Sequence, residues 1–134
     1  MRGDACFFDS NVVLYSQSVD PKKRAVARRL IGKGGCISVQ VLNECANVLR
    51  RRYQYDIALV GAFTKGLCEM MVVHAVTEET HHFAIQIMGE FRLATYDALI
   101  VSSAIESGAQ ILYSEDMHNG LRIGELTIVD PFKV

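Results

Sequence analysis

The sequence predicts an α/β domain built on a largely parallel sheet. Short apolar runs alternate along the chain with longer segments of helical periodicity, which is typical of strands joined by crossover helices. Hydrophobic residues make up 50% of the 134 positions, so a disordered chain is excluded and one domain over 1–134 is expected. No apolar run is long enough to cross a membrane.

The first part of the chain contains two predicted strands and the helices between them. The apolar run at 5–8 predicts a buried strand that ends at Asp9, and a helix should follow it directly. A second helix should span 21–32, because Asp20 offers an N-cap acceptor and a proline follows it. A short strand is then expected at 36–37.

Four more helices follow, each preceded by a residue whose side chain can accept a hydrogen bond at the N-cap. The expected caps and helices are Ser38 for 39–53, Asp56 for 57–71, Thr77 for 78–91 and Thr95 for 96–107. Apolar runs predict the remaining strands at 72–76, 111–113 and 126–129.

The net charge of −1 conceals an uneven distribution. Residues 20–52 hold nine basic and two acidic side chains, whereas 53–134 hold four basic and eleven acidic ones. Such a division suits a polyanion held against a metal-binding carboxylate cluster, and solvated helix faces are the alternative. The basic run Arg50, Arg51 and Arg52 either compensates a helix dipole or contacts nucleic-acid phosphates.

Four acidic residues are expected at the carboxyl edge of the sheet. Asp9 and Asp116 follow predicted strands, while Asp97 lies in the first turn and Glu44 in the second turn of helices that begin at the same edge. Helical periodicity places Glu44 and Asp97 on apolar faces, so both should point inward.

Converging carboxylates suggest a metal site. Buried carboxylates are costly unless they are paired or bound to metal, and several together repel one another. Oxygen ligands without histidine or cysteine favour Mg²⁺ or Mn²⁺ over zinc, and such a site can activate water against a phosphodiester. Each acid taken singly could instead be a helix cap, a turn residue or an ion-pair partner, but their joint placement favours the metal.

Four segments in order resemble PIN-domain ribonucleases, and specifically the VapC-type toxins of toxin–antitoxin pairs. The segments are FFDSNVVLY, ISVQVLNECANVLRRRY, LATYDALIVSSAIESGAQILYSEDMHNG and ELTIVDPF, and together they cover nearly the whole chain. The resemblance implies that 1–134 forms one PIN-like three-layer sandwich, a mostly parallel sheet flanked by helices. It assigns the catalytic and metal-binding roles to Asp9, Glu44, Asp97 and Asp116, and supporting roles to Ser10, Asn11 and Ser114.

The same resemblance implies an activity and partners. The activity is endoribonucleolytic and depends on Mg²⁺ or Mn²⁺; the partners are an RNA substrate, a cognate VapB-like antitoxin and a second copy of the chain. A mean hydropathy of +0.17 agrees with apolar surface covered by a partner on the helices at 21–31, 39–53 or 56–71. A PIN nuclease of RNA processing and a catalytically silent PIN-like binding module are the alternatives.

Two further expectations complete the prediction. A phosphoacceptor receiver domain is disfavoured. Such a domain needs paired acids after the first strand and a lysine near the last strand, whereas here Ser10 follows Asp9 and no lysine lies near 111–114. Four cysteines without metal-binding spacing, in a chain with no visible export signal, predict reduced thiols in a cytoplasmic protein.

Overall fold

The computed structural model describes residues 6–133 and confirms the α/β class. Its elements, in chain order, are β1 (Cys6–Phe8), α1 (Ser10–Tyr15), α2 (Pro21–Gly32), β2 (Cys36–Ser38), α3 (Val39–Arg51), α4 (Ile57–Met70), β3 (Val72–His74), α5 (Glu78–Phe91), α6 (Thr95–Glu106), β4 (Ile111–Tyr113), β5 (Arg122–Ile123) and β6 (Leu126–Val129). No helix within 6–133 is both long enough and apolar enough to span a bilayer.

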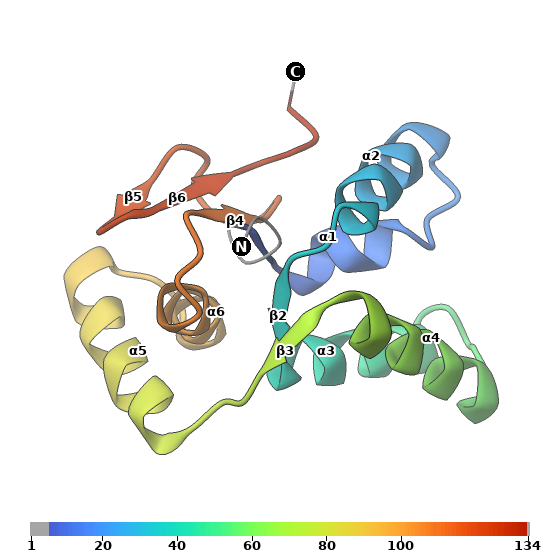
Figure 1. The fold of residues 1–134 in the computed structure, drawn as a ribbon, viewed down its shortest axis with the longest axis horizontal. Coiled ribbons are helices and arrows are strands. Elements are labelled where there is room, and N and C mark those ends of the chain that lie inside the picture. Colours follow the sequence, from blue (N-terminus) through green and yellow to red (C-terminus); the bar gives the residue numbers. More distant parts are fainter. Residues whose placement is uncertain (1–5, 134) are drawn as a thin grey trace.

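The sheet has the strand order β3-β2-β1-β4-β6-β5, and all neighbouring strands are parallel except β5 and β6. Helices α1 to α4 lie on one side of the sheet and α5 and α6 on the other, which gives three layers (Figure 1). The order reverses at β1, since β2 and β3 are added on one side and β4 on the other. In open α/β sheets, ligands bind beyond the carboxyl ends of the strands at such a reversal.

Most of the predicted helix starts are confirmed. The side chains of Asp20, Ser38, Asp56 and Thr77 all accept hydrogen bonds from backbone N–H groups in the first turns of their helices. The prediction of Thr95 as a cap is wrong: α6 begins at Thr95 itself, and the N-cap is Ala94, which has no side-chain acceptor.

The predicted strands and helices differ from the observed ones mainly at their ends. β3 stops at 74 and not at 76, the helix at 39 ends at 51 and not at 53, and β5 was not predicted. Ala5, the first residue of the predicted opening strand, lies outside the described residues.

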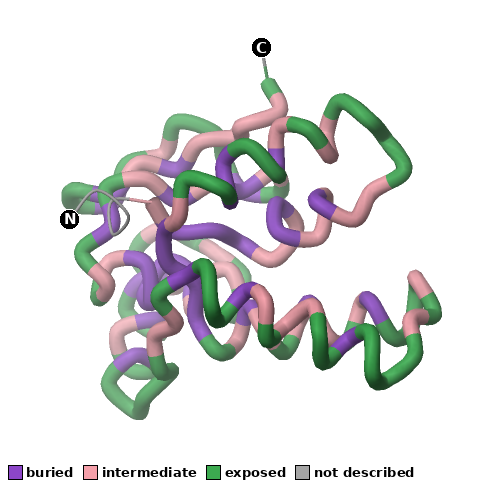
Figure 2. Tube along the Cα trace, turned by 45° about the vertical axis from the view of Figure 1, so that its right-hand side comes forward, coloured by how far each residue is buried: buried purple, intermediate pink, exposed green. Residues whose placement is uncertain are grey.

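The core lies on both faces of the central strands. Figure 2 shows the buried part of the chain running through the middle of the molecule, with exposed residues on the outer helices. Phe7, Ile37 and Leu112, on three adjacent strands, are fully buried. Gly35 has a φ of +149° and lies so close to β1 that a Cβ atom there would be 2.8 Å from the carbonyl oxygen of Cys6. Only glycine fits at this approach of the two strands.

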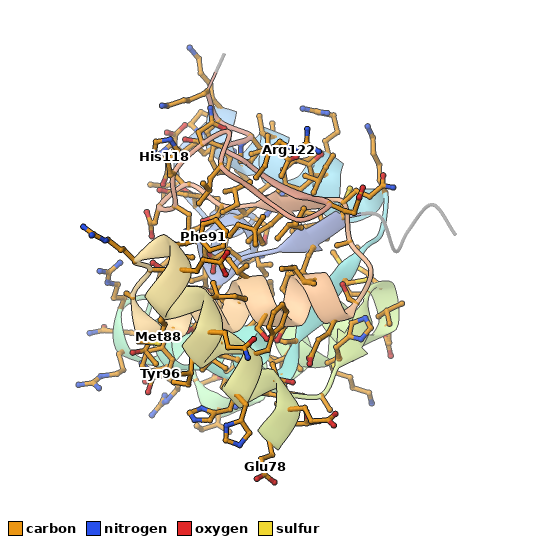
Figure 3. All side chains as sticks on the ribbon, turned by 90° about the vertical axis from the view of Figure 1, so that its left-hand side faces the viewer. Glu78, Met88, Phe91, Tyr96, His118 and Arg122 are labelled. Carbon is orange, nitrogen blue, oxygen red and sulfur yellow. The ribbon has the colours of Figure 1, made fainter. Side chains whose placement is uncertain are left out.

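Helix α5 holds α6 in place on its side of the sheet. Figure 3 shows α5, from Glu78 to Phe91, lying over α6. The buried Thr80 joins them: its hydroxyl donates to Glu106 (2.7 Å), and its carbonyl accepts from the Ser102 hydroxyl (2.9 Å). The start of α5 therefore lies by the end of α6. Asp97 lies in the first turn of α6, at the opposite end of that helix.

Candidate active site

A pocket of about 550 Å³ opens at the reversal point of the sheet. Its walls come from the residues after β1 and β4 and from the helices α1, α3 and α6. All four predicted acids line it: Asp9, Glu44, Asp97 and Asp116. The structure therefore brings together side chains that are spread over more than a hundred positions of the sequence.

Asp9 is the buried carboxylate of the pocket. It follows β1 directly and caps α1, so one carboxylate oxygen accepts from the backbone N–H of Ser10 (2.7 Å). The other oxygen accepts from the Ser114 hydroxyl after β4 (2.8 Å). Burial raises the pKa of Asp9 to about 6, the two serine hydrogen bonds oppose the rise, and the charges of Glu44 and Asp97 add to it.

The other three acids are less buried than Asp9. Glu44 and Asp97 are half-buried, and Asp116 is exposed. The pKa of Asp97 is raised, first by partial burial and then by the charges of Asp116 and Glu44. Glu44 is oriented by Gln40, whose amide nitrogen donates to it at 3.0 Å. Glu44 and Asp97, which were expected to point inward, therefore line the pocket without being fully buried.

The donors of the pocket suit a hard divalent cation. The ionisable groups of its wall are four carboxylates, two arginines and the phenol of Tyr96, and among the described residues no imidazole or thiol lines it. The nearby thiol of Cys45 is buried, and burial raises its pKa well above the usual range, so it stays protonated. Within 6–133, no three acidic, histidine or cysteine side chains form a ready-made metal cage. Mg²⁺ usually keeps several waters and takes only one or two carboxylates, so these residues fit it.

The predicted supporting residues surround Asp9. Ser10 and Asn11 line the pocket, and Ser114 lies beneath it, where its hydroxyl holds Asp9. The Asn11 side-chain oxygen accepts from the backbone N–H of Glu115 (3.3 Å), which ties α1 to the loop that carries Asp116. These contacts fix the position of the carboxylates.

The three arginines of α3 separate into two groups. Arg51 and Arg52 line the pocket, at the end away from the start of α3. Arg50 does not line it, because its guanidinium donates to the carbonyl oxygen of Tyr55 (2.9 Å). The structure thus brings two of the three predicted RNA-contacting arginines to the carboxylates.

Two lining residues with polar side chains were not predicted from the sequence. Asn47 lies one turn after Glu44 on α3, and Tyr96 directly precedes Asp97. The helical spacing of Asn47 from Glu44 was a usable signal, because residues three apart share a helix face. Tyr96 gave no such signal.

Comparison with known proteins agrees with this geometry. The family model of the PIN domain matches residues 6–119. No curated protein matches the sequence as a relative. A toxin–antitoxin complex from Klebsiella pneumoniae has a TM-score of 0.73 at 15% identity, covering 96% of this chain and 99% of that one.

Two further solved structures have the same fold. Mycobacterium tuberculosis VapC20, described as a toxin that cleaves the Sarcin-Ricin loop, has a TM-score of 0.68 at 21% identity, over 83% of this chain and 89% of its own. DNA-bound VapBC from Salmonella typhimurium has a TM-score of 0.68 at 18% identity, over 96% and 98%. Since the family model covers most of the chain, and the fold agrees throughout, the chain belongs to the PIN domain family.

Proposed function

We propose that this chain is a metal-dependent endoribonuclease and the toxin of a toxin–antitoxin pair. The observation that carries the proposal is the meeting of four carboxylates in one pocket, at the reversal point of a PIN-domain sheet. The described activity of VapC20 and the toxin–antitoxin assemblies among the structural neighbours support it.

Asp9, Glu44, Asp97 and Asp116 are the residues that would hold Mg²⁺ or Mn²⁺. Such an ion supplies positive charge against the phosphate and lowers the pKa of a water, so that the water can attack the phosphodiester. Asp9 is kept in one orientation by its two serine hydrogen bonds, which reduces the reorganisation needed on binding.

The arginines and the carboxylates of the pocket have different proposed roles. Arg51 and Arg52 would bind phosphates of the RNA strand and hold the scissile phosphate against the carboxylates. One or two of the four carboxylates would contact the ion directly, and one that holds it through a water could accept the proton released by the attacking water.

The direct test of the proposal is metal-dependent cleavage. The purified protein should cut RNA with Mg²⁺ or Mn²⁺ and stop when EDTA is added, and mapping of RNA ends after expression in cells should locate the cut. A protein that binds RNA and cleaves none with either ion would be a PIN-like binding module.

Arg52→Ala should weaken RNA binding and reduce the slope of log K against log salt by about 1, because one phosphate contact is lost. The cleavage position should not move, since phosphate contacts carry no sequence information. Arg50→Ala is the matched control, because this neighbouring arginine contacts the Tyr55 carbonyl and not the pocket. An equal salt slope in Arg52→Ala and the unaltered protein would assign Arg52 to structure.

The partner surfaces of the proposed toxin are apolar. A groove of about 370 Å³ between α2 and α4 is lined by Ile31, Phe63 and Leu67, and it suits an apolar segment of an antitoxin. At the start of α4, Ile57 is 69% exposed, which leaves apolar area for a second copy.

We expect a homodimer in sedimentation at micromolar concentration. Apolar side chains left exposed on α4 should be covered there, because burying apolar surface is the main driving force of association. Ile57→Glu should shift the sedimentation coefficient to that of the monomer. A strictly monomeric unaltered protein would contradict the dimer.

A further inference from the structure

A second cavity, of about 730 Å³, adjoins the carboxylate pocket. It lies between the first turns of α3 and α6 and the residues that follow β3. Glu44, Asn47 and Tyr96 line both cavities, so the two lie side by side. The catalytic roles proposed above leave this second cavity, the tyrosine–amide cavity, without an occupant.

Part of its wall is apolar and exposed. Tyr96 is 66% exposed and lies at the edge of the molecule in Figure 3. Val39 and Val76, from two other elements, are also exposed and line the same cavity. An accessible aromatic ring with aliphatic neighbours is the kind of surface on which a nucleobase stacks.

The rest of the wall carries amides. Gln40, Asn43 and Asn47 lie along one face of α3, and carboxamides form hydrogen bonds with the edges of bases. The Gln40 amide nitrogen donates to Glu44 and to the Tyr96 carbonyl, at 3.0 and 3.4 Å. Its oxygen is buried and accepts no hydrogen bond from any residue in 6–133.

Helix α3 connects the tyrosine–amide cavity to the arginines. From Gln40 to Arg51 the helix rises by roughly 16 Å, at about 1.5 Å per residue. Along this length lie Gln40 and Asn43, then Glu44, then Asn47, and at the end Arg51, which Arg52 follows. An RNA strand that ran along α3 would pass the first two amides, with Tyr96 of α6 beside them, then the carboxylates and then the arginines.

We propose that the tyrosine–amide cavity binds one nucleobase of a single-stranded RNA whose scissile phosphate lies at the carboxylates. The inference rests on the proposed nuclease function and extends it to the substrate: an unpaired nucleotide next to the cleaved bond, with its base stacked on Tyr96. The amides favour a base over a purely apolar protein segment, because three polar side chains on an interface would need partners.

The test uses one cleavable RNA in versions that carry a single abasic ribose at successive positions. With the unaltered protein, the abasic ribose at one position beside the cut should lower cleavage and binding roughly tenfold, as loss of one base stack does. Tyr96→Ala should cleave and bind the intact RNA roughly tenfold less well and be insensitive to the abasic ribose at that position. Tyr96→Phe should behave as the unaltered protein, because it keeps the ring.

Controls separate this inference from the nuclease proposal. Ile85→Ala removes an exposed apolar side chain of α5 outside the cavity and should keep full sensitivity to the abasic ribose. Binding is measured by fluorescence anisotropy with EDTA, where nothing is cut. Position-dependent binding without cleavage in Mg²⁺ would overturn the nuclease and keep the base site.

Two results would overturn the base site itself. One is equal binding and cleavage of all abasic RNAs by the unaltered protein. The other is a Tyr96→Ala variant that has a changed sedimentation coefficient but is as sensitive to the abasic ribose as the unaltered protein. That result would make the cavity an interface between copies of the chain.

Discussion

Asp97→Asn is expected to abolish RNA cleavage and, at the same time, to stabilise the metal-free protein. Asparagine has nearly the shape of aspartate but lacks its charge, so a ligand of the proposed ion is weakened and cleavage should fall at least about a hundredfold. The raised pKa of Asp97 shows that its charge is unfavourable in the folded state, because of partial burial and of Asp116 and Glu44. Since Asp97 is half exposed, the gain in unfolding free energy should be at most about 1 kcal/mol.

Thermal unfolding with EDTA and with millimolar Mg²⁺ tests both parts. Mg²⁺ should raise the midpoint of the unaltered protein by mass action and that of Asp97→Asn much less. Glu90→Gln, which removes an exposed charge from α5, should respond to Mg²⁺ like the unaltered protein. If Asp97→Asn lowers the metal-free midpoint and keeps the Mg²⁺ response, Asp97 is a structural residue.

The stability of the metal-free protein should fall as the pH rises from about 4 to about 6. The pKa of Asp9 is about 6 in the folded chain against a usual 3.8, so the folded state prefers the protonated form. Below both values this carboxyl has no effect on stability, and above both the folded state bears the whole penalty of the buried charge. This difference between the folded and unfolded pKa corresponds to a loss of about 3 kcal/mol in the free energy of unfolding.

Denaturant unfolding with EDTA at pH 4 and pH 7 measures this change. The comparison is with Asp9→Asn, which keeps the N-cap acceptor of α1 and cannot ionise. The unfolding free energy should fall more between the two pH values in the unaltered protein, and Mg²⁺ should reduce the difference. Equal pH dependence in the two proteins would show that folding does not raise the pKa of Asp9.

Local chemistry explains which elements could be predicted. Asp20, Ser38 and Asp56 cap helices because a short polar side chain reaches the first free N–H groups, and this depends on neighbours in sequence alone. Thr95 satisfies the same rule and yet lies inside α6. β5 has two residues and exists only through its pairing with β6, so no local pattern marks it.

The candidate site was predictable in its members and less so in its environment. Strand ends and helix starts placed the four acids at one edge, because parallel strands share a direction. How deeply each carboxylate is buried depends on packing, so the periodicity of α6 gave the face of Asp97 but not its half-exposed position. Arg50 and Arg52 are two residues apart, and only the fold shows that one faces the Tyr55 carbonyl and the other the pocket.

The pairing of β1 with β4 also determines when the site can form. The hydrogen bond between Asp9 and Ser114 joins residues 105 positions apart, and no nearer strand can replace β4 in it. Contacts of such long range cost more loop-closure entropy than local ones and slow folding. The strands β1, β2 and β3 and their helices emerge first from the ribosome, and at that stage Asp9 has neither its serine nor Asp116 beside it. A partly synthesised chain therefore holds an incomplete carboxylate pocket, and the proposed nuclease activity would require β4 to be in place.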